Sequence, residues 1–139
     1  IVSDLHLDDT SITGYRFKIF KFLQLKIQEY NIKNLIILGD ILDKKDKHSS
    51  YLVNAICREL QFLIKDLDID IFIVMGNHDY VEPDEPFLNF LNWMPNIYFI
   101  KDPEVFEIKG KRCLFLPHAK QPEDTWLKVK FYEKYDQAR

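Results

Sequence analysis

Cysteine is scarce in this chain: its 139 residues include two, Cys57 and Cys113. The two cysteines lie far apart and form no CxxC pair, so the sequence supports no disulfide framework. We therefore expect a reducing, cytoplasmic environment. Cys57 falls inside a predicted helix, where we expect a small buried apolar side chain rather than a nucleophile.

Long apolar runs are absent as well. No stretch of about 18 apolar residues occurs, which predicts no transmembrane helix and no membrane partner, and no signal peptide is visible. Internal repeats, low-complexity segments and linkers between domains are also missing. Since 47% of the residues are hydrophobic, the chain can form one packed domain with its own core. We expect residues 1–139 to belong to that domain.

Positive charge is not in excess. The formal net charge is -3 at pH 7, which excludes a globally basic surface for nucleic acid. Any polyanion must therefore be held by a local group of cations or through bound metal. Lys44, Lys45 and Lys47 form one charged loop, which fits either a solvated loop or a contact with a phosphate backbone.

Hydrophobic periodicity divides the first half of the chain into alternating strands and helices. Apolar residues recur every three or four positions in residues 15–30 and 51–65, which predicts two helices. Shorter apolar runs predict strands at 34–38 and 69–75, and residues 1–3 have the pattern of the end of an earlier strand. Because long crossovers join these strands, we expect them to be parallel, with right-handed connections.

The same patterns predict how these elements are covered and capped. The almost continuous apolar run at 34–38 predicts a strand buried on both faces. In the helix at 15–30 the aromatic members of the periodic stripe are Phe17, Phe20 and Tyr30, so we expect them in the core and not on a base-stacking surface. Ser49 or Ser50 is expected to cap the second helix.

The second half of the chain predicts shorter elements. They are a helix at 87–94, strands at 97–100, 104–108 and 112–116, and a final helix at 123–138. Lys109 and Gly110 separate the last two strands and predict a hairpin turn. Trp93 and Trp126 are expected to be packing residues.

Polar residues follow each of the three predicted parallel strands. They are Asp4 and His6 after the first strand, Asp40 and Asp43 after the second, and Asn77, His78 and Asp79 after the third. Gly39 ends the second strand and lets the backbone turn sharply. Because open α/β folds place their chemistry at the carboxyl ends of parallel strands, we expect these side chains to converge. On a strand, the two-residue spacing of Asp4 and His6 puts both side chains on one side.

These residue types suit a metal centre. Carboxylate oxygens, an amide oxygen and imidazole nitrogens suit Mn, Fe or Zn. Asp40 has two oxygens and can bridge two ions, and a pair of ions can activate a shared water for in-line attack on phosphorus. Each motif alone also fits a surface loop, a cap or an ordinary turn. The metal interpretation depends on three strand ends matching one template together.

Taken in order, the three motifs resemble those of the calcineurin-like metallophosphoesterases. Asp4-Leu5-His6 matches D-x-H, Gly39-Asp40-Ile41-Leu42-Asp43 matches G-D-x-x-D, and Gly76-Asn77-His78-Asp79 matches G-N-H-[DE]. The resemblance covers roughly the first eighty residues. It implies an enzyme that hydrolyses phosphoester bonds with two divalent ions, most often Mn²⁺, with Fe or Zn as alternatives.

The resemblance also implies a role for each site residue. Asp4 and His6 would bind one ion. Asp40 would bridge the two ions, and Asn77 would bind the second. His78 would be a catalytic residue and not a ligand, protonating the leaving oxygen or stabilising the charged phosphoryl group. Asp43 and Asp79 resemble supporting carboxylates that orient loops or histidine side chains.

Within the superfamily the chain is most similar to the SbcD-type DNA repair nucleases, including phage versions. The cues are the long helix after the first motif, the charged loop ahead of a Ser-capped helix, and the strand that ends at Leu116-Pro117. This similarity implies a DNA exonuclease or endonuclease subunit with an SbcC-like ATPase partner, in the host cytoplasm if a phage encodes it, and allows an oligomer. The alternatives are a phosphomonoesterase or cyclic-nucleotide phosphodiesterase on the same scaffold, or a non-catalytic binding subunit.

The implied fold is a four-layer α/β/β/α sandwich, of which this chain would be the N-terminal portion. The family's later His and its final G-H-x-H are missing, and the one histidine after residue 79 is His118. Some compact members have a ligand His at a comparable strand end, which makes His118 a candidate ligand. In SbcD-like chains that position is usually not a ligand, and we favour that interpretation. We therefore expect a chain trimmed at both ends that is inactive by itself.

Overall fold

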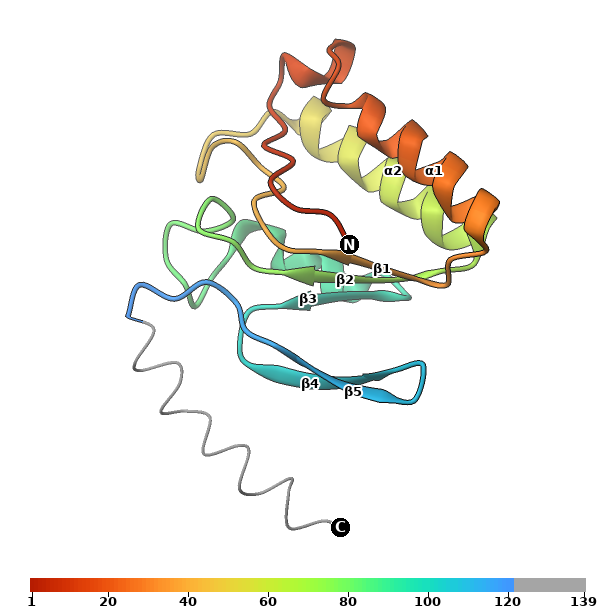
Figure 1. Ribbon diagram of the computed structural model, residues 1–139. Coiled ribbons are helices and arrows are strands. Elements are labelled where there is room, and N and C mark those ends of the chain that lie inside the picture. The colour runs from red at the N-terminus through yellow and green to blue at the C-terminus, as the bar shows by residue number, and fades with distance from the viewer. Residues whose placement is uncertain (122–139) are drawn as a thin grey trace.

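The computed structural model describes residues 1–121, which form two β-sheets and the helices that cover one of them (Figure 1). In chain order the elements are the 3₁₀ helix η1 (Ser11–Thr13), α1 (Lys18–Tyr30), β1 (Asn34–Ile37), α2 (Ser50–Leu67), β2 (Asp70–Val74), the 3₁₀ helix η2 (Phe87–Trp93), β3 (Ile97–Ile100), β4 (Glu104–Ile108) and β5 (Lys111–Phe115). The helix predicted at 123–138, with Trp126, lies outside the described residues.

Two separate sheets form the layers of the molecule. β1, β2 and β3 make a parallel sheet in that order, and β4 and β5 make an antiparallel hairpin. In Figure 1, α1 and α2 lie over one face of the parallel sheet, and the hairpin lies on the other side. The expected α/β class is confirmed, since residues 1–121 contain a helical layer, a parallel sheet and an antiparallel sheet.

Two hydrophobic clusters fill the spaces between these layers. The larger lies between the helices and the parallel sheet, where Phe20, Leu60 and Ile71 are at most 1% exposed. The smaller lies between the two sheets and consists of Phe72, Val74, Ile100 and Phe115. Successive strand side chains point to opposite faces, so β2 supplies Ile71 to the larger cluster and Phe72 to the smaller.

β1 is less covered than its sequence predicts. Leu35 and Ile37 are buried and Ile36 is half-buried, but Leu38, directly after the strand, is 51% exposed. The reason is that the buried residues of the smaller cluster come from β2, β3 and β5, so the hairpin covers the neighbouring strands better than it covers β1. The expectation that residues 34–38 are buried on both faces is wrong for the face that includes Leu38.

The helix ends follow local chemistry. The Leu52 N–H donates to Ser49 Oγ at 3.0 Å, which confirms Ser49 as the cap of α2. α1 begins at Lys18, later than predicted, because residues 15–17 form a turn in which the Lys18 N–H donates to the Tyr15 C=O at 3.1 Å. Asn31 ends α1 in the left-handed region, with φ of 48°.

Residues 87–93 form a 3₁₀ helix and not the predicted α-helix. The Asn92 side chain bonds the Phe99 backbone in both directions, at 2.7 and 3.0 Å, and the Met94 N–H donates to Leu91 three residues back. This helix buries its leucines and leaves Trp93, its last residue, 88% exposed. Tyr30, the last residue of α1, is 64% exposed. The expectation that Trp93 and Tyr30 are packing residues is therefore wrong.

The β4–β5 hairpin turns where the sequence predicts. Lys109 and Gly110 both have positive φ, 52° and 71°, as a two-residue turn between twisted strands requires. β5 begins one residue earlier than predicted because Lys111 pairs with Ile108 directly across the turn. Over the described part of the chain, no helix combines the length and apolarity needed to cross a bilayer.

Candidate metal centre

Two glycines allow the turns after β1 and β2 to touch. Gly39 has a φ of +78°, and a Cβ built on it would lie 2.6 Å from the Gly76 Cα. A Cβ on Gly76 would lie 2.3 Å from Asp40 Oδ1. Since no side chain fits at such distances, glycine at both positions lets the two turns pack directly against each other.

Asp79 fastens the same two turns together. Its carboxylate is fully buried and accepts three backbone hydrogen bonds, from Gly76 at 2.8 Å, Asp40 at 2.9 Å and Ile41 at 3.1 Å. Burial raises the pKa of Asp79, while the N–H donors of Gly76, Asp40 and Leu42 oppose that change. This geometry agrees with a carboxylate that orients loops.

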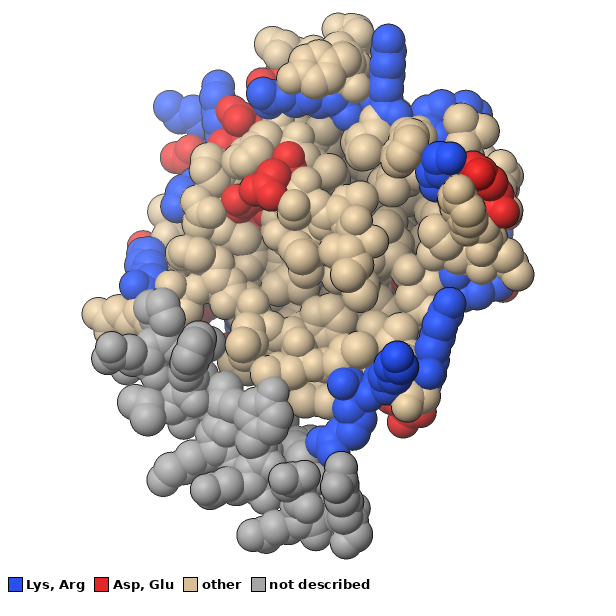
Figure 2. All heavy atoms as spheres, in the orientation of Figure 1, with Lys and Arg blue, Asp and Glu red and all other residues tan. Residues whose placement is uncertain are grey.

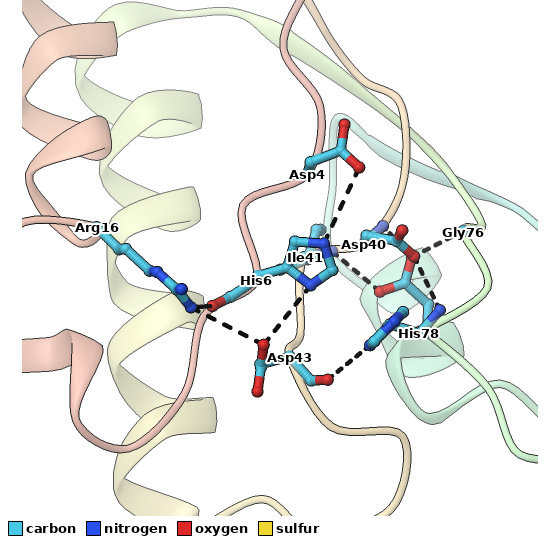
Figure 3. Close-up of polar contacts among 9 residues, drawn as sticks. Asp4, His6, Arg16, Asp40, Ile41, Asp43, Gly76 and His78 are labelled. Atoms are coloured by element: carbon cyan, nitrogen blue, oxygen red, sulfur yellow. Dashed lines mark hydrogen bonds and ion pairs between the residues drawn. The ribbon is translucent and has the colours of Figure 1, made fainter.

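Asp40 is held at the carboxyl edge of the sheet by the other turn. It is 9% exposed, and its Oδ1 accepts a hydrogen bond from the His78 backbone N–H at 2.8 Å. Asp4, His6 and Asp40 each offer a ligand atom, and these atoms lie within 4.8 Å of one another. A transition-metal ion lies about 2.0–2.3 Å from each of its ligand atoms, so these three donors fit one ion after movements that bring them closer together. Figure 3 shows the three side chains pointing toward one another.

The segment that contains Asp4 and His6 is not a regular strand, although the spacing argument for these two residues assumed one. It runs beside β1 and the turn that follows, with single parallel bridges from Val2 to Ile37 and from Leu7 to Leu42. Between the bridges Asp4 and His6 adopt φ of 53° and 42°. The two side chains do approach each other, but through this irregular backbone and not through the alternation of a strand.

All three members of this group have a left-handed backbone, since φ of Asp40 is 52°. Such a conformation is uncommon outside glycine and is enriched at functional sites, where the surrounding structure maintains the strain. Here the surrounding structure is a row of hydrogen bonds. The Asp4 N–H donates to Gly39 at 3.3 Å and the His6 N–H donates to Asp40 at 2.9 Å.

Figure 3 shows Arg16 to the left of His6 and Asp43 below it. His6 Nδ1 is 3.7 Å from Asp43 Oδ1, and His6 Nε2 is 4.0 Å from Asp4 Oδ1. The Arg16 guanidinium donates to the His6 C=O at 2.7 Å and lies 3.8 Å from Asp43 Oδ1. The sequence analysis missed Arg16. Its one distinguishing signal is scarcity, because the chain has 4 arginines against 15 lysines.

His78 lies next to this group with a defined orientation. Its ring packs edge-on against His6 with centroids 4.8 Å apart. Its Nδ1 lies 2.6 Å from the Asp43 C=O, and because a carbonyl only accepts hydrogen bonds, Nδ1 carries a proton. Nε2 is then the nitrogen left to act on another molecule.

The last two predicted ligands, Asn77 and His118, lie at different places near the carboxyl edge of the sheet. Asn77 lies in the turn between Gly76 and His78 and is half-buried. His118 is exposed, and its Nδ1 lies 2.9 Å from the Tyr80 hydroxyl. Its backbone N–H donates to the Met75 C=O at 2.8 Å, which places it at the same sheet edge. His118 is not part of the group formed by Asp4, His6 and Asp40.

Comparison with known proteins adds one finding. The sequence profile that describes calcineurin-like phosphoesterases matches residues 1–138. A search of curated proteins found no significant match.

Proposed function

The chain belongs to the calcineurin-like phosphoesterase family, and from that premise we propose that it is a metal-dependent phosphodiesterase acting on DNA. The observation that carries the proposal is the convergence of Asp4, His6 and Asp40, whose ligand atoms lie within 4.8 Å of one another. An SbcC-like ATPase subunit is part of the proposal for the full-length protein.

The proposed centre takes two divalent ions. Asp4 and His6 would hold the first ion, Asp40 would be shared by both ions, and Asn77 would help to hold the second. When bound, the ions activate water and neutralise phosphoryl charge. Mn²⁺ is the proposed metal because hard oxygen donors are combined with imidazole, with Fe and Zn as alternatives.

The residues around the proposed centre hold its side chains in position. Asp79 holds the backbone that presents Asp40, and Asp43 contacts the ring of His6. The Asp43 C=O also fixes the His78 ring through Nδ1. When Nε2 of His78 is protonated, it donates that proton to the leaving oxygen as the bond from oxygen to phosphorus breaks, and a neutral imidazole remains.

The openness of the site and its cations support a polymeric substrate. The Asp4 side chain is 66% exposed, so the group opens directly to solvent. The ammonium groups of Lys45 and Lys120 lie 5.3 and 5.9 Å from the ring of Tyr80, which follows Asp79. Such cations can hold the phosphates next to the scissile one.

The substrate class is tested with the full-length protein, Mn²⁺ and three substrates: duplex DNA, DNA hairpins and p-nitrophenyl phosphate. We expect cleavage of DNA and little hydrolysis of the monoester. The opposite preference would favour a phosphomonoesterase, which the net charge of -3 supports. Binding of DNA without hydrolysis of any substrate would favour a non-catalytic subunit.

The acid is tested by His78→Asn. We expect the cleavage rate to fall by about 10²- to 10⁴-fold, with Mn²⁺ affinity retained in calorimetry. His118→Asn is the matched control, and we expect it to retain Mn²⁺ affinity. Unchanged cleavage in His78→Asn would contradict the proposed acid, and lost Mn²⁺ affinity in His118→Asn would make His118 a ligand.

A further inference from the structure

α1 carries aromatic side chains on its solvent side as well as on its core side. It buries Phe20 and leaves Phe22 53% exposed, and Tyr15 in the preceding turn is 77% exposed. Neither Tyr15 nor Phe22 belongs to the periodic stripe that the sequence predicts for the core. Residues two positions apart in a helix lie on opposite faces, so Phe22 cannot join Phe20 in the core.

A cleft of about 420 Å³ lies between the N-terminal segment and the start of α1. The residues that line it include Asp4, Tyr15, Arg16, Lys18 and Phe22. Asp4 belongs both to this lining and to the metal-binding group, so the cleft opens directly onto the candidate centre. Its volume lies within the range of ligand sites, roughly 300–1,000 Å³, which is enough for a nucleotide.

The cleft combines two exposed aromatic rings with two cations. Lys18 is exposed and has no ion pair among residues 1–121. Arg16 is permanently charged, and its guanidinium reaches toward His6 and Asp43 (Figure 3). In the view of Figure 2, Lys and Arg atoms lie around the edge of the face, and along its upper part, on the side where Figure 1 places α1, they alternate with Asp and Glu atoms.

We propose that this cleft, lined by Tyr15, Lys18 and Phe22, binds single-stranded nucleic acid and leads the strand to Asp4. Aromatic rings stack on bases of any sequence, and cations follow the phosphates. The inference rests on the proposed function and specifies its substrate as single-stranded nucleic acid. An apolar protein segment would use the rings as well, but it would not use an unpaired lysine beside a centre for phosphoesters.

The test measures binding without catalysis. Fluorescence anisotropy follows a labelled oligothymidylate of twelve nucleotides with this chain in EDTA, over a range of salt concentrations. We expect Tyr15→Ala and Phe22→Ala each to weaken binding by about 5- to 150-fold, as loss of base stacking does. Lys18→Gln should reduce the slope of log affinity against log salt by about 0.7, the value for one phosphate contact on a single strand.

Tyr51→Ala is the matched control, because Tyr51 is 59% exposed on α2 and lies outside the cleft. We expect it to bind as the unsubstituted chain does, and thermal melting checks that all variants are folded. Unchanged affinity in both aromatic variants, or an equal loss in Tyr51→Ala, would overturn the inference. So would binding of the matching duplex with the same losses in Tyr15→Ala and Phe22→Ala.

A separate assay keeps this inference distinct from the proposed function. Hydrolysis of bis(p-nitrophenyl) phosphate by the unsubstituted full-length protein with Mn²⁺ tests the phosphodiesterase alone. If the protein hydrolyses this substrate but oligonucleotide binding is unchanged in Tyr15→Ala and Phe22→Ala, the proposed binding cleft is wrong and the proposed phosphodiesterase activity is supported. If oligonucleotide binding depends on both aromatic rings but the protein does not hydrolyse this substrate, the binding cleft is supported and the proposed phosphodiesterase activity is contradicted.

Discussion

Gly39 and Gly76 matter because neither has a side chain. The contact between their turns delivers Asp40 to the edge of the sheet and lets Asp79 reach three backbone N–H groups. Sequence motifs name such glycines as turn formers. The structure adds a second reason, which is the close approach of two turns that are far apart in the chain.

Gly76→Ala is expected to damage the metal centre. Its new Cβ would lie 2.3 Å from Asp40 Oδ1, so Asp40 must move, and Mn²⁺ affinity measured by calorimetry should fall at least about 10-fold. Gly110→Ala is the matched control, because φ is +71° there and a Cβ would meet nothing within 4 Å. It should lower stability by about 1–2 kcal/mol and keep Mn²⁺ affinity. Equal Mn²⁺ affinity in both variants would show that the close approach does not position Asp40.

Cys57 on α2 is only half-buried, where the sequence predicts a buried side chain, and its titration gives a test of this partial burial. Burial raises the pKa of its thiol above the ordinary value of 9.0, so the reactive thiolate forms only at higher pH. We expect alkylation by iodoacetamide, followed by mass spectrometry, to reach half its maximal rate at a pH above 9.0 in the folded chain. Because the folded state favours the neutral thiol, this group's contribution to stability is lost as pH rises through the raised pKa. Half-maximal alkylation at or below pH 9.0 would contradict the burial.

At the scale of elements, α2 is the helix that the sequence specifies best. It has a capping serine, a buried stripe and a left-handed residue, Asp68, directly after its last turn. α1 has no side-chain cap, and its start is correspondingly displaced from the prediction. The Ser49 hydroxyl also contacts Asp9 Oδ1, so the cap of α2 reaches the loop that follows the first motif.

Ser49→Ala is expected to destabilise the protein by about 1 kcal/mol, the usual cost of losing a helix cap. The change is read as a lower midpoint of urea unfolding at an unchanged slope. Ser50→Ala is the control, since Ser50 is exposed and lies inside the helix. Equal midpoints for the two variants would mean that the Ser49 hydroxyl contributes nothing to the helix.

At the scale of the whole molecule, metal binding should couple to folding. The three candidate ligands come from the N-terminal segment and the turn after β1, which approach each other only in the folded chain. A ligand that binds the folded state alone stabilises it by about 2.7 kcal/mol at 100 times its Kd. Mn²⁺ should therefore raise Tm in differential scanning calorimetry.

Asp40→Asn should remove most of this shift in Tm, because it takes away the ligand nearest the sheet. Asp102→Asn is the control, since that side chain is 72% exposed and lies outside the metal-binding group. It should keep the full shift. If Mn²⁺ raised Tm equally in Asp40→Asn, the ion would be bound elsewhere.

The sequence by itself determined the features that depend on neighbouring residues. The alternation of strands and helices, the Ser49 cap, the turn at Lys109 and Gly110, and three strand-end motifs all follow from patterns a few residues long. The family followed from the motifs, and the profile match over residues 1–138 supports it.

Only the tertiary structure decided how those motifs meet. Contacts between separate segments of the chain set the left-handed backbone of Asp4 and His6. They also set the hydrogen bond from the turn after β1 to Asp79 and the position of Arg16 against the His6 C=O. The exposure of Phe22 and Leu38 likewise depends on what covers each face. Local periodicity carries no information about such partners, because each is supplied by a distant part of the chain.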